Sequence, residues 1–172
     1  HVSPASVGQI APRRVALLMD LNIGCCRNLV RGVHAYGLER QNWILRNARC
    51  DGHVLAFLKD WNPDGVIATV FDPGLGRALI RLGRPVVDTA FTVPGLKLPV
   101  VDVDHDEVGR LAAEYLRECG YRHFGYLGSE SALYSQAREA SFRRHLVAEG
   151  HSVSSFLVGR LYEDLSTSSW KR

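Results

Sequence analysis

The chain has 172 residues, of which 46% are hydrophobic and 23% charged, which is the composition of an ordinary globular domain rather than of a disordered or collagen-like chain. Its 21 Lys and Arg residues against 18 Asp and Glu give a net charge of +3, well short of the basic excess typical of nucleic-acid-binding domains. No segment approaches the roughly 18 apolar residues of a membrane span, and the first residues lack a signal-peptide pattern, so we expect a cytoplasmic protein without a membrane partner.

Short apolar runs alternate with amphipathic stretches along the chain. The first run, 14–19 (RVALLM), suits a strand buried on both faces, and helical spacing of apolar residues follows over 27–40. The further predicted strands are 42–46, 64–70, 85–88, 98–103, 124–128 and 152–158, and the further predicted helices are 54–61, 75–82, 107–119 and 133–149. This alternation predicts an α/β fold with parallel strands and right-handed crossovers.

The segment 107–119 carries the clearest helical pattern of the sequence. Its apolar residues share one helical face: Val108, Leu111, Ala112, Tyr115, Leu116 and Cys119. Asp104 stands three residues before Glu107, so we expect its carboxylate to cap the first turn while Glu107 reaches back to the cap. Gly120 is expected to end the helix.

The four cysteines show no spacing typical of a zinc site. They are Cys25, Cys26, Cys50 and Cys119, and no Cys-x-x-Cys pair occurs among them. We expect reduced, mostly buried thiols, and neither a metal nor a cofactor.

Ligands of open α/β sheets bind outside the carboxyl ends of the strands, so the residues that directly follow the predicted strands are the candidates for a site. These residues are Asp20, Asn22, Phe71, Asp72, Asp88, Phe91, Asp104 and His105. They are acids, amides and aromatics, and neither G-x-G-x-x-G nor G-x-x-x-x-G-K-[ST] occurs, so nucleotide phosphates fit poorly. A neutral polyhydroxylated ligand fits better, because carboxylates and amides bond hydroxyls and aromatic faces cover C–H surfaces.

Each of these candidates also has a purely structural interpretation. Asp104 can act only as a helix cap, and Asp20 can be a solvated loop acid. Phe71 and Phe91 are more often core residues than a platform for a ligand.

Arg138 is the most informative single residue. It lies four residues before Phe142 on the predicted helix 133–149 and shares the face that this phenylalanine buries, so its guanidinium must find partners. Its planar fork could hold two adjacent hydroxyls of a ligand. The alternative is an ion pair with Glu130 or Glu139.

Several segments, taken as a linked series over about 13–158, resemble a known group of regulators. The stretch VVDVDHDEVGRLAAEYLRECGYRHFGYLG resembles the LacI/GalR regulators, in which Arg138 falls where a ligand-binding arginine stands. The stretches RRVALLMDLNIGCCRNLVRGVHAY, LKDWNPDGVIATVFD and RPVVDT are similar to the xylose operon regulators, which join a sugar-binding domain to a C-terminal AraC-type DNA-binding domain. The sequence departs at Gly24–Cys26, where these relatives tend to carry a tyrosine and a polar or glycine residue before a shared arginine, here Arg27.

The resemblance implies a parallel-sheet, periplasmic-binding-protein-like type I fold with two lobes that close on a sugar. It assigns 1–12 to a flexible tail, 13–121 to a complete lobe one and 122–172 to a partial lobe two, with the DNA-binding domain absent from this chain. It further implies a homodimer, a pentose such as D-xylose as ligand, and DNA as a partner through that absent domain. The candidate ligand-binding residues are then Asp20, Asn22, Arg27, Phe71, Asp72, Asp88 and Arg138, with no catalytic residue.

Two other classes of function stay open at this stage. A sugar-processing enzyme could use Asp20 or Asp104 with His105, but adjacent side chains at a helix start point apart and no nucleophile elbow is present. A phosphoacceptor receiver domain would carry paired acids directly after the first strand, which this sequence lacks.

Overall fold

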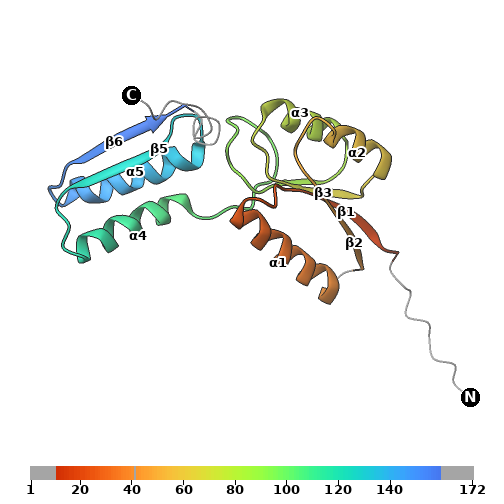
Figure 1. Cartoon of the computed structure of the whole chain (residues 1–172), viewed down its shortest axis with the longest axis horizontal. Helices are drawn as coiled ribbons and strands as arrows, with labels where there is room; N and C mark the ends of the chain where they lie inside the picture. The colour runs from red at the N-terminus through yellow and green to blue at the C-terminus, as the bar shows by residue number, and fades with distance from the viewer. Residues whose placement is uncertain (1–10, 41, 160–172) are drawn as a thin grey trace, which may run out of the picture. The chain divides into compact units, whose positions relative to one another are not determined.

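The computed structural model describes residues 11–40 and 42–159, which belong to two compact units (Figure 1). Among the described residues, the first unit comprises 11–40, 42–89 and Leu96–Val100, and the second comprises Ala90–Gly95 and 101–159. Each unit has its own parallel sheet, as the alternating pattern of the sequence predicts.

The first unit is built on a four-stranded parallel sheet in the order β2-β1-β3-β4. Its elements in chain order are β1 (Arg13–Leu18), α1 (Gly24–Arg40), β2 (Trp43–Ala48), α2 (Val54–Trp61), β3 (Gly65–Ala68), α3 (Pro73–Arg81) and β4 (Val86–Asp88). Helix α1 covers one face of the sheet, and α2 and α3 cover the other (Figure 1). The central strand β1 therefore has no solvent-facing side, and Ala16, Leu17 and Leu18 are fully buried, as its continuous apolar run predicts.

The predicted strand 98–103 is wrong. The structure forms only an isolated bridge between Asp88 and Val100, in which the Asp88 amide donates to the Pro99 carbonyl at 2.8 Å. The chain passes from the first unit into the second after Val100, so no strand of the first sheet is left to pair with the residues that follow. Val101 and Val103 are accordingly exposed.

The second unit consists of two parallel strands and two helices. Its elements are α4 (His105–Glu118), β5 (Phe124–Ser129), α5 (Leu133–Ala148) and β6 (Val153–Val158). Both helices lie on the same side of the β5–β6 sheet (Figure 1). Phe124, Phe142, Leu146 and Val153 form its core together with Ala113 of α4.

The assignment of α4 to the first lobe, whose end we predicted near residue 121, disagrees with the packing. Helix α4 lies against α5, because Gly109 and Ala113 present almost no side chain to it. A Cβ atom added at Gly109 would stand 2.5 Å from the Arg138 carbonyl oxygen and 2.7 Å from the Cβ of Ser141. The boundary between the two compact units therefore precedes α4.

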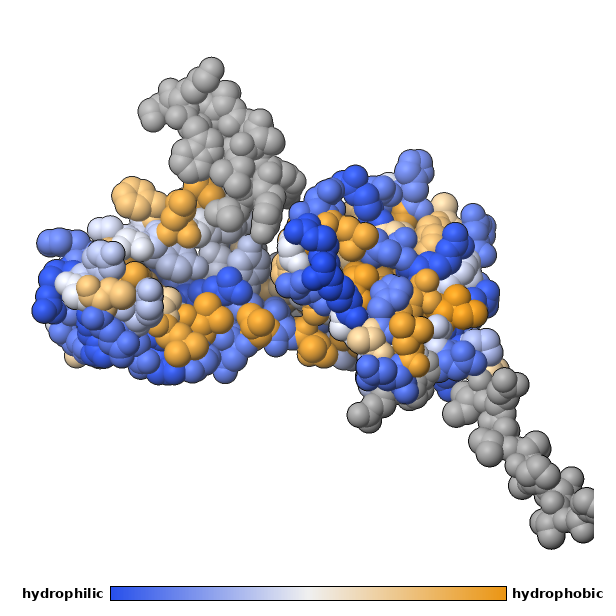
Figure 2. Space-filling model, turned by 60° about the horizontal axis from the view of Figure 1, so that its bottom comes forward, coloured by the Kyte–Doolittle hydropathy of each residue, from blue (hydrophilic) through white to orange (hydrophobic). Residues whose placement is uncertain are grey.

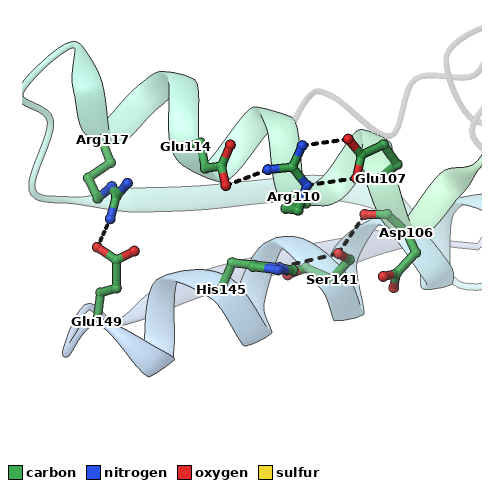
Figure 3. A network of polar contacts seen from close by, with 8 residues as sticks. All are labelled: Asp106, Glu107, Arg110, Glu114, Arg117, Ser141, His145 and Glu149. Atoms are coloured by element: carbon green, nitrogen blue, oxygen red, sulfur yellow. Dashed lines mark hydrogen bonds and ion pairs between the residues drawn. The ribbon is translucent and has the colours of Figure 1, made fainter.

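Polar contacts reinforce this helix pair (Figure 3). The Ser141 hydroxyl donates to the Asp106 carbonyl oxygen at 2.6 Å, and Arg117 forms an ion pair with Glu149. Asp104 caps α4 as predicted, since its carboxylate accepts from the Glu107 amide at 3.0 Å. Glu107 does not return to the cap, because its own carboxylate is paired with Arg110.

The apolar face of α4 that dominates the sequence pattern is largely exposed in this unit. Val108, Leu111 and Tyr115 are 37%, 50% and 66% exposed, while the face buried against α5 carries the small residues Gly109 and Ala113. Hydrophobic residues are visible on the surface of this unit (Figure 2). Helical periodicity therefore predicts α4 correctly but not the face that packs on α5.

The cysteines are reduced, as expected, but they are not mostly buried. All four carry free thiols, and only Cys26 is buried. Cys119, which directly follows α4, and Cys25, in the first turn of α1, are both exposed. Within the described residues, no helix is long and apolar enough to cross a bilayer.

Candidate functional site

The order of the first sheet places a topological switch point between β1 and β3, which are neighbours although β2 separates them in sequence. The crevice at such a point, outside the carboxyl ends of the strands, is where open α/β sheets bind ligands. Asp20 and Asn22 follow β1 at this edge. The Asp20 carboxylate accepts from the Asn22 amide at 2.9 Å and lies 3.6 Å from the Arg49 guanidinium.

Arg27 supports the loop after β1 from within the first turns of α1. Its Nη1 donates to the carbonyl oxygens of Leu21 and Asn22 at 2.8 and 3.0 Å. The structure therefore gives this predicted ligand-binding residue the task of fixing the backbone that carries Asp20 and Asn22. The remaining nitrogens of the exposed guanidinium leave its predicted contact with a ligand open.

Asp72 and Asp88, the two other predicted acids, already bond backbone amides. Asp72 is the N-cap of α3 and accepts from the Leu75 amide at 2.7 Å. Asp88 is 3% exposed, and its carboxylate accepts from the Val70 amide at 3.1 Å. Asp72 remains exposed to a ligand, whereas Asp88 primarily holds the loop after β3 in place.

The interpretation of Phe71 and Phe91 as core residues is wrong. Phe71 is 49% exposed directly beyond β3, and Phe91 is 42% exposed in the second unit. Phe91 also adopts a φ of 43°, in the left-handed region that a bulky residue rarely occupies. Both rings are thus available as apolar surfaces, Phe71 at the predicted edge and Phe91 on a separate unit.

Sequence reasoning missed two hydroxyl residues at the edge of the first sheet. Thr69 and Thr89 directly follow β3 and β4, and their hydroxyl oxygens lie 3.1 Å apart. The Cys26 sulfur lies 3.8 Å from the Thr69 hydroxyl. Thr89 directly follows the predicted strand 85–88, which was an available signal, whereas Thr69 lies inside the predicted strand 64–70.

The thiols at this edge are poor nucleophiles. Desolvation by burial raises the pKa of the Cys26 thiol, and the hydrogen bond to Thr69 only partly opposes it. Cys50 is exposed as a residue, but its sulfur is partly enclosed and donates to the Leu18 carbonyl oxygen at 3.4 Å, and desolvation of this thiol raises its pKa to about 11. Both groups are therefore neutral thiols at pH 7, which disfavours thiolate chemistry.

Arg138 belongs to the second unit, where it contacts neither Glu130 nor Glu139, the two ion-pair partners considered from sequence. Its Nε donates to Nδ1 of His105 at 3.2 Å, and its guanidinium lies over the Tyr134 ring, 5.2 Å from the centroid. Glu139 is instead bonded to Ser155 and Arg143, and these contacts hold the pKa of its carboxyl below the usual value. His105, which the sequence offered as a strand-end candidate and as a catalytic partner, is thus a neighbour of Arg138.

The arrangement suits recognition better than catalysis. The carboxylates and hydroxyls at the edge of the first sheet are held by hydrogen bonds, and the exposed Phe71 adjoins Asp72 in the sequence. Among the described residues, no three His, Cys, Asp or Glu side chains are grouped as a metal site would require. These are the features of a binding edge for a polar, uncharged ligand.

Comparison with solved structures identifies the class of fold. The chain has an α/β, periplasmic-binding-protein-like fold with parallel sheets, and it covers part of each similar structure. No protein-family model and no curated protein sequence matches the chain.

Three of the similar structures illustrate the match. The xylose-binding transcription activator xylR is 20% identical with a TM-score of 0.71, and the aligned region covers 94% of this chain and 41% of that one. The regulator CcpA of Lactococcus lactis is 18% identical with a TM-score of 0.73, covering 89% and 61%. A periplasmic binding protein/LacI regulator from Alkaliphilus metalliredigens, complexed with D-xylulofuranose, is 17% identical with a TM-score of 0.67, covering 92% and 63%.

The chain therefore spans about two fifths to two thirds of the length of these proteins. All three are described as transcription regulators or as a periplasmic binding protein/LacI regulator.

Proposed function

We propose that this chain is the sugar-sensing part of a DNA-binding transcription regulator of the LacI/GalR type. The observation that carries the proposal is the switch point of the first sheet, where Asp20 and Asn22 follow β1 beside the hydroxyls that follow β3 and β4. Polar groups at that position bind ligands in open α/β sheets, and this set lacks the glycines of a phosphate-binding loop. The fold shared with sugar-binding regulators supports the same assignment.

D-xylose or a related pentose is the ligand that we propose. The similar structures include a xylose-binding activator and a complex with D-xylulofuranose, which is also a five-carbon sugar. Asp20, Asn22 and Asp72 would accept or donate bonds to its hydroxyls, and Phe71 would cover a C–H face. Arg138 of the second unit would supply two parallel N–H donors to neighbouring hydroxyls.

The proposed mechanism needs no bond of the sugar to break. A ligand shifts the equilibrium between two conformations of a protein only as far as its affinities for them differ. Here that difference in affinity would control how a dimer binds DNA in the cytoplasm. The DNA contacts would belong to an AraC-type domain outside this chain, because paired half-sites require paired reading heads.

Calorimetry tests this proposal directly. The protein is titrated with D-xylose, D-ribose, L-arabinose and D-xylulose at pH 8, and we expect saturable heat for at least one of them. Asp20→Ala and Arg138→Gln should each weaken that binding by about tenfold or more, the effect of removing one charge-assisted hydrogen bond. Arg31→Gln, a change of an exposed arginine on α1, is the matched control and should leave the affinity unchanged.

The outcome against the proposal is equally concrete. Absence of heat for every sugar at millimolar concentration removes the sugar-sensing assignment. If ¹³C NMR of the incubated mixture detects conversion of any of these sugars, the protein is an enzyme instead.

A further inference from the structure

His105 joins a carboxylate to Arg138 through the two nitrogens of its ring. It lies at the start of α4 and is 8% exposed. Its Nε2 is 2.9 Å from Oδ2 of Asp102, and its Nδ1 is 3.2 Å from Nε of Arg138. The three side chains thus form a continuous series of hydrogen bonds in the second unit.

The partners of the ring define which nitrogen carries the proton. The arginine Nε–H can only donate, so Nδ1 must be the accepting, unprotonated nitrogen. The remaining ring proton is then on Nε2, where it donates to the Asp102 carboxylate. The arrangement requires a neutral imidazole, because the imidazolium has no acceptor to offer Arg138.

The same bond fixes the orientation of the guanidinium. It engages Nε, so the fork formed by Nη1 and Nη2 takes no part in this bond. The Tyr134 ring lies under the guanidinium at 5.2 Å and restricts its plane further. Arg138 is therefore held by two contacts at its inner end, which lowers the entropy lost when its outer end binds a ligand.

We infer that His105 is a positioning residue for Arg138 and that its protonation weakens sugar binding, so that sensing depends on pH. This inference rests on the proposed function, in which Arg138 contacts the sugar. On protonation Nδ1 becomes a donor, the bond from Arg138 is lost, and two cations face each other over the same short distance.

The charged and aromatic groups around the ring come from three segments. The carboxylate of Asp102, which precedes α4, and the guanidinium of Arg138 on α5 both contact the ring. Phe91 stacks on the ring at 6.2 Å between centroids, and Tyr134 lies at 5.9 Å. Among the described residues, Asp102 is the carboxylate that contacts this buried ring.

The first arm of the test measures sugar affinity by calorimetry at pH 8 and pH 5.5. We expect the protein to bind about tenfold more weakly at pH 5.5, the worth of one lost hydrogen bond to a charged group. His105→Asn keeps an acceptor oxygen near the position of Nδ1 but cannot titrate, so its affinity should be the same at both pH values. His34→Asn, at an exposed histidine of α1, is the control and should retain the full pH dependence.

The second arm needs no sugar and separates this inference from the proposed function. In ¹⁵N NMR spectra, His105 should show the Nε2–H tautomer at pH 8, and the Arg138 Nε–H should exchange slowly at pH 8 and rapidly at pH 5.5. If no sugar binds at either pH, the proposed function fails while this arm still decides the hydrogen-bond switch. An Arg138 Nε–H that is equally protected at both pH values, or wild-type affinity that is independent of pH, overturns the inference.

Discussion

Replacement of Gly109 by alanine tests the packing that holds Arg138 in place. The added Cβ would lie 2.5 Å from the Arg138 carbonyl oxygen and 2.8 Å from the Phe142 amide nitrogen, both atoms of the α5 backbone. A comfortable contact between carbon and a carbonyl oxygen is about 3.3 Å, so the two helices must separate by roughly 0.8 Å locally. Backbone atoms cannot rotate aside as the end of a flexible side chain can.

The expected destabilisation follows from two opposing effects. Inserting a methyl group into a tightly packed contact costs about 1–3 kcal/mol, and backbone neighbours place this site near the upper value. The helix propensity of alanine over glycine returns about 1 kcal/mol. We therefore expect Gly109→Ala to lower the free energy of unfolding of the second unit by about 2 kcal/mol.

Gly32→Ala is the matched control for this experiment. Gly32 lies within α1, and a Cβ there would meet no atom within 4 Å. This change gains helix propensity without the clash and should stabilise α1 by up to about 1 kcal/mol. Hydrogen exchange measured by mass spectrometry reads the two units separately, through peptides of α5 and of α1.

The two variants must move in opposite directions. Faster exchange in α5 for Gly109→Ala, with slower exchange in α1 for Gly32→Ala, supports the close helix contact. If both substitutions slow exchange by similar amounts, α4 and α5 do not approach as closely as described, and the support given to Arg138 by this contact is wrong.

Three further predictions concern the second unit, each measured by urea unfolding. Lowering the pH below 4.5 should reduce stability, because the folded-state pKa of the Glu139 carboxyl lies below its value of 4.5 in the unfolded chain. The stabilisation by this carboxylate is present above pH 4.5 and is lost as the carboxylate becomes protonated. Ser155→Ala, which removes a hydrogen bond to the carboxylate, should flatten this pH dependence, and an unchanged slope would contradict the prediction. Leu146→Ala should lower the free energy of unfolding by about 2–5 kcal/mol because Leu146 is buried. Leu111→Gln should change it by no more than about 0.5 kcal/mol because Leu111 is exposed, and equal losses for the two variants would refute that exposure. Asp104→Ala should cost about 1 kcal/mol with a loss of α4 helicity, and unchanged stability would mean that the cap does not matter.

Local patterns predict most of the elements of this fold. The run at 14–19 becomes a central strand that is buried from Val15 onward because helices cover both faces of its sheet, which its lack of polar alternation already indicates. Gly120 and Gly150 follow their helices with positive φ values, as helix-ending glycines do. These features depend on neighbouring residues, so a single sequence contains them.

The errors involve contacts between distant parts of the chain. The segment 98–103 has the apolar composition of a strand, but the chain enters the second unit after Val100 and finds no partner strand. The apolar stripe of α4 predicts a buried face, yet the contact with α5 selects the small residues Gly109 and Ala113. Periodicity shows where hydrophobic residues gather and not which neighbour approaches.

The sequence predicted where the candidate residues lie better than it predicted which groups each of them contacts. Asp20 and Asn22 follow the first strand as expected, whereas Arg27 and Asp88 bond the backbone of the loops around them. The link from Arg138 to His105 joins residues 33 positions apart, and no local pattern predicts such a pair.

The central claim is that a polar edge of this protein binds a sugar without altering it. Titration of the protein with D-xylose and the other pentoses in a calorimeter, with recovery of the sugar for NMR, measures both halves of that claim. We predict saturable heat that Arg138→Gln weakens at least tenfold, with chemically unchanged sugar recovered. Absence of heat for every sugar, or recovery of a converted sugar, would contradict the account.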